Sequence, residues 1–183
     1  MKFATKLLLL LLLISAAAAA KKHDPLTEAE TDQLREVAMQ PYERLKLLIK
    51  FTQQRLDSID QVRVDPKAVN DRGQQIHDLL EDFTSLVDET NDNLDQFEAR
   101  KFDKDLVKQY HKGLKELIEA DDRFQLKLKA LQTAAESDPQ FRKYLPDFRF
   151  VLQDAQESVK SSQEMAREYI ETTHEDKDEK KKK

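Results

Sequence analysis

A heptad seam in the middle of the chain constrains its fold more than any other feature. Between residues 66 and 100 the apolar positions recur in alternating steps of four and three residues. These positions are Val69, Gly73, Ile76, Leu80, Phe83, Val87, Thr90, Leu94 and Phe97. That spacing is typical of helices that pack side by side with a left-handed twist. The segment is therefore predicted to be one long amphipathic helix that buries this face against partner helices.

Three further segments carry a comparable stripe, so the chain is predicted to be all-α. The stripes lie within residues 41–62, 104–136 and 147–173, and a shorter helix is predicted over residues 27–39. Short links between long helices favour antiparallel neighbours. We therefore predict an antiparallel, up-down-up-down four-helix bundle of long helices, with the short N-terminal helix packed across one end. The alternative is a splayed helical rod that forms a homodimer through the same seams.

The first twenty residues have the pattern of a secretory signal peptide. Lys2 and Lys6 form a basic start, an apolar run covers residues 7–14, and small alanines occupy residues 16–20. The apolar run is shorter than the roughly 20 residues that a spanning helix needs. We therefore expect cleavage after Ala20 and export of the remaining chain to the periplasm or the medium, with no integral membrane segment left.

The remainder divides into three parts. We expect a flexible start over residues 21–26, a single helical domain over residues 27–174, and a charged, disordered tail over residues 175–183. The chain has no cysteine, so its fold is expected to stand without disulfides. The absence of cysteine also argues against a bacterial lipoprotein, because the lipid is attached to a cysteine that follows the signal peptide.

The charge balance restricts the classes of partner. The chain has 31 basic and 36 acidic residues and a net charge of −5. Binding to nucleic acid needs a basic face, and adsorption to anionic membranes needs basic clusters. We therefore expect neither nucleic acid nor a membrane surface as the general partner, and expect protein partners instead.

Two charged stripes on consecutive predicted helices are oriented against the helix dipole. Lys104, Lys108 and Lys112 lie in the first turns of one helix, whereas Asp92 and Asp95 lie near the end of the preceding one. In an antiparallel hairpin the two stripes would face each other and select the register of the helices. The alternatives are an anionic ligand bound by the lysines, or simple solvation of both stripes.

Asp121 is the one acid on the apolar seam of residues 104–136. It lies between Leu117 and Phe124, and Ser162 would lie at its level if the last two long helices pair antiparallel. A buried carboxyl must find partners or keep a proton. We expect Asp121 and Ser162 to form a polar core layer that fixes register, or Asp121 to turn to the edge of the seam. A catalytic or metal-binding acid is the other alternative.

No constellation for catalysis or cofactor binding is visible. The chain has only two glycines and lacks a Gly-x-Ser-x-Gly motif and a glycine-rich phosphate loop. One Glu-x-x-His pair, Glu171 with His174, is too little for a di-metal bundle, which needs two such pairs. We expect no enzyme, no cofactor and no metal. Four aromatic residues in the last link and helix are expected to plug one end of the bundle or to form a binding groove: Phe141, Tyr144, Phe148 and Phe150.

Two short segments carry resemblances to known proteins. Residues 26–30, Leu-Thr-Glu-Ala-Glu, followed by Gln33-Leu34-Arg35, resemble the opening of the periplasmic LTxxQ family, the Spy-type chaperones. Glu30 stands where that family has glutamine. Thr27 and Glu30 also form a capping box, which makes the segment a good helix start. Residues 41–51 resemble uncharacterised exported bacterial all-helical proteins, a likeness that implies no activity.

These observations favour a non-enzymatic, exported helical protein that acts as a protein-binding module or scaffold. The LTxxQ resemblance implies the first alternative, a periplasmic chaperone that shields unfolded clients. The seam carboxylate suggests a second alternative, a carboxylate metal-binding bundle.

Overall fold

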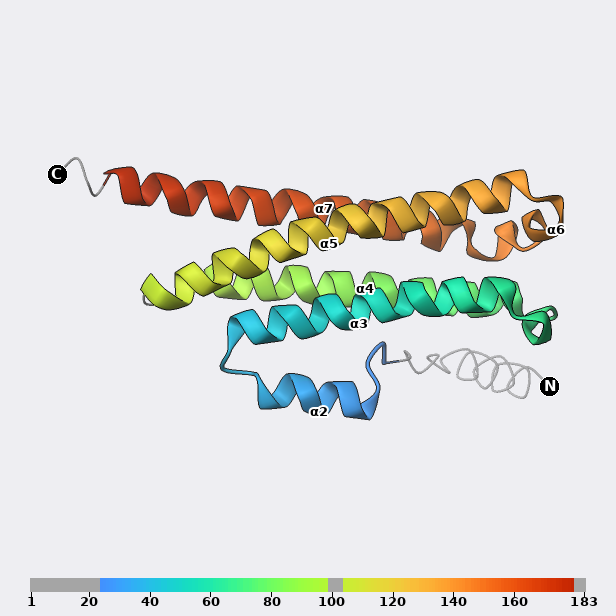
Figure 1. The fold of residues 1–183 in the computed structure, drawn as a ribbon, viewed down its shortest axis with the longest axis horizontal. Coiled ribbons are helices and arrows are strands. Elements are labelled where there is room, and N and C mark those ends of the chain that lie inside the picture. Colours follow the sequence, from blue (N-terminus) through green and yellow to red (C-terminus); the bar gives the residue numbers. More distant parts are fainter. Residues whose placement is uncertain (1–23, 99–103, 180–183) are drawn as a thin grey trace, which may run out of the picture.

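The computed structural model describes residues 24–98 and 104–179, which form helices joined by short turns (Figure 1). The prediction of an all-α fold is confirmed, since these residues include no strand. In chain order the elements are α2 (Glu28–Glu36), α3 (Pro41–Val64), the 3-10 helix η2 (Pro66–Ala68), α4 (Arg72–Glu98), α5 (Lys104–Ser137), α6 (Pro139–Arg142) and α7 (Leu145–Glu179).

The helix bounds differ most from the predicted ones at two places, the start of α4 and the end of α7. The helix predicted from residue 66 begins instead as η2, because Asp65 caps this short turn by accepting a hydrogen bond from the Lys67 amide at 2.8 Å. At the other end, α7 continues to Glu179, six residues beyond the predicted end at residue 173. The predicted signal peptide, residues 21–23 and residues 180–183 lie outside the described residues.

Each long helix packs extensively on two others. α3 and α7 both contact α4 and α5, so the cyclic order is α3, α4, α7, α5. In Figure 1, α3 and α5 run in one direction and α4 and α7 in the other. The pairs α3–α4 and α5–α7 are therefore antiparallel, whereas α3–α5 and α4–α7 are parallel.

This arrangement differs from the predicted bundle, in which all neighbours are antiparallel. α4 and α5 follow each other in sequence but lie diagonally opposite, so a short link between them does not make them neighbours. Gly113 gives one physical reason. It brings α5 so close to α3 that a Cβ at this position would lie 2.9 Å from Tyr42 Cδ2 and 3.1 Å from Leu45 Cδ2.

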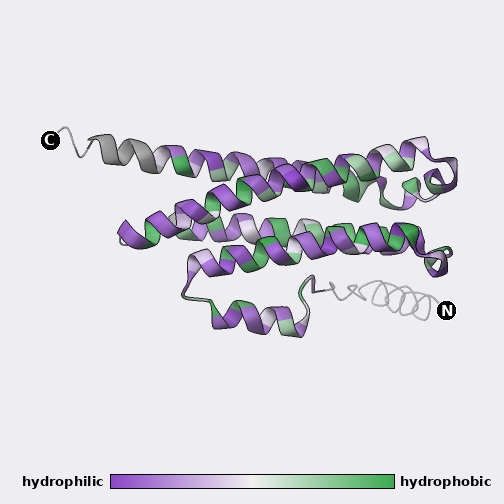
Figure 2. Ribbon diagram, viewed as in Figure 1, coloured by the Kyte–Doolittle hydropathy of each residue, from purple (hydrophilic) through white to green (hydrophobic). Residues whose placement is uncertain are grey.

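The predicted seams form the core. Seven of the seam positions of α4, from Ile76 to Phe97, are buried, and the seams of α5 and α7 are buried over almost their whole length. Figure 2 shows that apolar and hydrophilic positions alternate along the long helices. Phe83 of α4 and Phe124 of α5 meet edge to face in the centre, with ring centroids 5.6 Å apart. The first seam residue, Val69, is 43% exposed and lies outside the core.

The short helix α2 is attached to α3 by an ion pair. The predicted capping box is present, with Thr27 and Glu30 exchanging hydrogen bonds between side chain and backbone. Arg55 of α3 binds Glu30 through two hydrogen bonds of 2.9 and 2.7 Å and also donates to the Pro25 carbonyl. None of the helices in the described ranges is both long and apolar enough to cross a bilayer.

Candidate functional site

Asp121 and Ser162 lie beside each other in the core, between α5 and α7. The two residues are 1% and 0% exposed. Burial raises the pKa of Asp121 to about 7, the Ser162 hydroxyl opposes this rise, and the charge of Asp122 adds to it. Within the described part of the chain, no hydrogen-bond partner of good geometry is present for the two carboxyl oxygens of Asp121 or for the Ser162 Oγ. The buried position leaves no path for a substrate, so this pair suits a structural layer.

The other two long helices each add a buried threonine to their seams. Thr52 of α3 and Thr90 of α4 are both 2% exposed. Each hydroxyl donates at 2.8 Å to a carbonyl of its own helix, Thr52 to Leu48 and Thr90 to Leu86. Their hydrogen-bonding needs are met within their own helices, unlike those of Asp121 and Ser162.

The predicted stripe pairing is not formed between described residues. No ion pair there joins Lys104, Lys108 or Lys112 to Asp92 or Asp95. Lys112 lies 3.8 Å from Glu116 in its own helix, and its ammonium sits 5.5 Å from the Tyr42 ring centroid. The reason is the packing order, because the extensive contacts of α5 are with α3 and α7.

The packing separates charge in a way that the linear sequence does not reveal. Residues 72–97 of α4 include seven acidic residues and one arginine, and residues 145–172 of its parallel neighbour α7 include six acidic and three basic residues. α3 has five basic and three acidic residues, and α5 has seven basic and six acidic ones. The α4–α7 side of the molecule is therefore strongly acidic, whereas the α3–α5 side is slightly basic.

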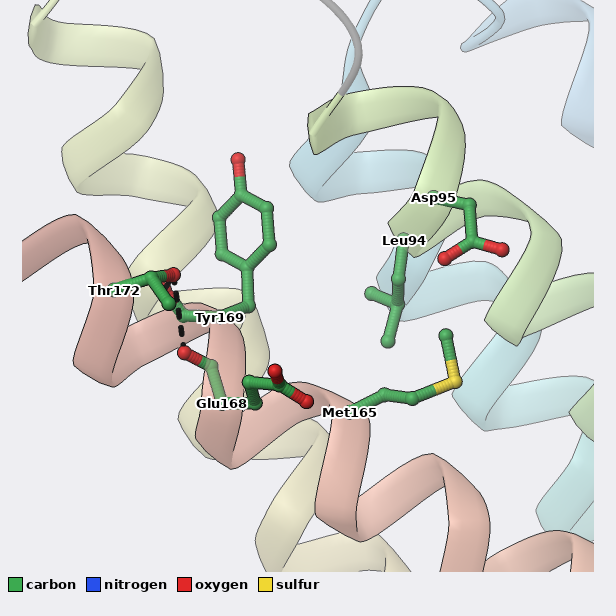
Figure 3. A pocket seen from close by; sticks show the side chains of 6 residues that line it. All are labelled: Leu94, Asp95, Met165, Glu168, Tyr169 and Thr172. Carbon is green, nitrogen blue, oxygen red and sulfur yellow. Dashed lines mark hydrogen bonds between the residues drawn. The ribbon is translucent and has the colours of Figure 1, made fainter.

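A shallow pocket of about 140 Å³ lies between α4 and α7 on this acidic side (Figure 3). Leu94, Met165 and Tyr169 supply apolar surface, and the carboxylates of Asp95 and Glu168 stand at the rim, with Thr172 completing it. Neither carboxylate has an ion-pair partner among the described residues. The pocket thus offers an apolar floor beside two solvated negative charges. We name it the acidic pocket.

An aromatic cluster supports the acidic pocket from within. Phe97 and Tyr110 are stacked, and Tyr169 meets both rings edge-on, with centroids 5.9 and 5.8 Å away. Burial raises the pKa of the Tyr110 hydroxyl, and the neighbouring Tyr169 and Asp95 add to the effect. The hydroxyl finds no hydrogen-bond acceptor in the described structure. These rings fix the position of Tyr169 at the pocket.

Three possible metal ligands lie together on the surface of α4. His77, Asp78 and Glu81 bring a ring nitrogen and carboxylate oxygens within 4.8 Å of one another. His77 Nδ1 is 3.3 Å from Asp78 Oδ1 and 3.9 Å from Glu81 Oε2. These residues are not part of the Glu-x-x-His pattern considered in the sequence. The signal that could have indicated them is a histidine followed by a glutamate four positions later on a predicted helix, because such residues are neighbours on the helix surface.

Comparison with protein-family models, with curated proteins and with solved structures finds no match for this chain.

Proposed function

We propose that this protein is exported and acts without catalysis, by binding another protein through its acidic α4–α7 side. The observation that carries the proposal is the acidic pocket, where Asp95 and Glu168 flank the apolar surface of Leu94, Met165 and Tyr169. A partner segment with a lysine or arginine beside an apolar side chain would complement both features. Such charge complementarity raises association rates and selects partners.

The absence of a recognisable reaction centre in the sequence agrees with this proposal. Asp121 has the most perturbed pKa of the described carboxyl groups, but it is 1% exposed and borders no described pocket. The lining of the acidic pocket contains no histidine, lysine or cysteine beside these exposed carboxylates. They are suited to attract a cation, and electrostatic attraction is what a binding module needs.

The test is site-specific photo-crosslinking of the exported chain. A photoreactive residue at Thr172, on the rim of the acidic pocket, is expected to yield one or a few discrete crosslinked partners. The same residue at Ser161, which is exposed elsewhere on α7, is the matched control and is expected to yield fewer. The double variant Asp95→Asn, Glu168→Gln should abolish the Thr172 products. Equal products from both positions, or products that persist in the double variant, would overturn the proposal.

The chaperone alternative makes a different prediction in the same assay. An LTxxQ-type chaperone would crosslink to many unrelated exported proteins and would suppress the aggregation of an unfolded client. The segment behind that resemblance already has a structural role here, since Glu30 caps α2 and binds Arg55. Partner selection through the acidic pocket is for this reason the preferred proposal.

The metal-binding alternative is favoured by one observation, the group formed by His77, Asp78 and Glu81. Imidazole and carboxylate ligands suit Zn²⁺ and similar divalent ions. Titration with Zn²⁺, followed by the NMR signals of His77, tests this alternative. Loss of binding in His77→Gln, with no loss in His111→Gln, would support it, and unchanged His77 signals would remove it.

A further inference from the structure

A second pocket lies at the opposite end of the molecule from the acidic pocket, beside α6 and the turn between α3 and α4. Phe141 and Tyr144 form its aromatic wall, with ring centroids 6.0 Å apart and each side chain 7% exposed. The Tyr144 hydroxyl donates a 2.7 Å hydrogen bond to the Val69 carbonyl, which fixes the ring against the turn. Three of the four aromatic residues noted in the sequence therefore plug this end, while Phe150 is 75% exposed.

Three cationic side chains gather on these two rings. The Arg63 guanidinium carbon lies 5.6 Å from the Phe141 centroid, and the Arg72 guanidinium carbon lies 5.4 Å from that of Tyr144. The Lys143 ammonium lies 4.7 Å from the Tyr144 centroid. Aromatic faces attract cations within about 6 Å, so the rings hold all three positive charges at one place. This is notable in a chain whose net charge is −5.

The positive charges are only partly neutralised. Arg72 uses two donors on the carbonyls of Val62 and Asp65, where it caps the end of α3. Arg63 reaches Asp60 at 3.5 Å, a long contact, and Lys143 forms no ion pair within the described ranges. The single carboxylate in the lining, Asp138, accepts a hydrogen bond from the Gln140 amide as the cap of α6. This second pocket therefore keeps an excess of positive charge, and we name it the cationic pocket.

Apolar surface completes the cationic pocket, which encloses about 270 Å³. Val64 and Val69 belong to its lining and are 79% and 43% exposed, and Ala134 adds a methyl group. Sites for drug-sized ligands hold roughly 300–1,000 Å³. A space below that range suits a group of one or two side chains in size, with an apolar part that covers the valines.

We infer that the cationic pocket binds a carboxylate carried on a small apolar body. Planar guanidinium groups such as that of Arg63 bind carboxylates through paired hydrogen bonds, and Lys143 adds a mobile point charge. The exposed valines would contact the apolar body. The carboxylate can belong to a free metabolite-sized acid or to the C-terminus of a peptide, since both present the same chemistry. This inference does not depend on the proposed partner binding at the acidic pocket.

The experiment is a titration of the purified chain, followed by two-dimensional NMR of its backbone amides. N-acetyl-leucine is the first probe, and N-acetyl-leucine amide, which lacks the charge, is its control. We expect the acid to shift amides around Val69 and Tyr144, and expect the amide to cause no comparable shift. A peptide ending in leucine, compared in its free and amidated forms, distinguishes the two sources: tighter binding of the free peptide than of N-acetyl-leucine indicates a C-terminus.

Variants locate the binding. Lys143→Gln and Arg63→Gln are each expected to weaken binding of N-acetyl-leucine about tenfold, as loss of a hydrogen bond to a charged group does. Lys108→Gln, an exposed lysine without an ion pair among the described residues, is the matched control and should leave the affinity unchanged. Arg72 is left intact because it caps α3. Circular dichroism verifies that each variant is folded.

Three results would overturn the inference. The first is amide NMR shifts that lie away from Val69 and Tyr144, and the second is equal binding of N-acetyl-leucine and its amide. The third is binding of inorganic phosphate as tight as that of N-acetyl-leucine, because it would show that the apolar body contributes nothing. Photo-crosslinking from Thr172 is unaffected by any of them, so failure here and failure of the proposed partner binding are separate outcomes.

Discussion

The carboxyl group of Asp121 in α5 lies against the hydroxyl of Ser162 in α7, and both are shut off from solvent. A carboxylate in such a place lacks the hydration that stabilises its charge. The core therefore favours the protonated acid, which is why the pKa of Asp121 rises to about 7. This pair makes the stability of the helical core depend on pH.

We predict that the free energy of unfolding carries a contribution from Asp121 that decreases between about pH 4 and pH 7. Below pH 3.8, the ordinary pKa of the group, both the folded and the unfolded chain hold the proton. Above it the unfolded chain releases the proton first, which favours unfolding, and above pH 7 both states are ionised. A shift of this size corresponds to about 4 kcal/mol in total. Urea unfolding at a series of pH values measures it.

Asp121→Asn isolates that contribution, because other acids titrate over the same range. Glu30 and Asp57, for example, have lowered pKa values and contribute in the opposite direction. We expect the variant to exceed the wild type in stability by about 2–4 kcal/mol at pH 7.5 and to lose most of this advantage at pH 4. A stability difference that is constant from pH 4 to 8 would contradict a protonated Asp121.

Two tyrosines provide a matched pair of predictions about hydroxyl groups. The Tyr110 hydroxyl is buried without a described hydrogen-bond partner, whereas the Tyr144 hydroxyl donates to Val69. Removing a buried hydroxyl that has no hydrogen-bond partner relieves the cost of its desolvation, whereas removing a hydroxyl that has a partner loses the hydrogen bond. We expect Tyr110→Phe to stabilise by up to about 1 kcal/mol and Tyr144→Phe to destabilise by about 1 kcal/mol. Thermal unfolding of both variants measures the effects, and equal signs would contradict the prediction.

The sequence predicted the elements of this fold better than their arrangement. The three-four spacing from Ile76 to Phe97 identified the buried face of α4, and the same reasoning put Asp121 and Ser162 on facing seams. Both results depend on helical periodicity within one segment, which local sequence determines. The predicted pairing of Lys104, Lys108 and Lys112 with Asp92 and Asp95 is not formed among the described residues, because α4 and α5 are not neighbouring helices.

Which helices pack as neighbours depends on features that the spacing of apolar residues does not show. Gly113 lies on a buried face of α5 and allows close approach to Tyr42, but in the sequence it is simply a glycine within a helical pattern. The acidic and cationic pockets also arise from residues of separate helices, such as Asp95 with Glu168, and Arg63 with Lys143. Sequence spacing cannot bring these residues together before the helix order is known.

The attachment of α2 gives a third prediction. Arg55 and Glu30 have side chains only 12% and 10% exposed, and Arg55 also lies 3.8 Å from Asp82. Arg55→Ala would leave two poorly solvated carboxylates without their cation, and we expect a loss of about 1–3 kcal/mol. Limited proteolysis should then cleave between α2 and α3 before the rest of the chain. Arg35→Ala, which breaks the exposed pair with Asp32, should change stability by less than about 0.5 kcal/mol.

The last prediction concerns the contact of α5 with α3. Glycine to alanine inside a helix ordinarily stabilises by about 1 kcal/mol. At Gly113 the added methyl would lie 2.9 Å from the Tyr42 ring and 3.1 Å from Leu45, and Tyr42 is held by a 3.0 Å hydrogen bond to Glu116. We therefore expect Gly113→Ala to destabilise by about 1–3 kcal/mol, as overpacking does. Tyr42→Ala should relieve the clash, so that Gly113→Ala made in that background becomes neutral or stabilising. If Gly113→Ala has the same cost in both backgrounds, the contact with Tyr42 is not the source of that cost.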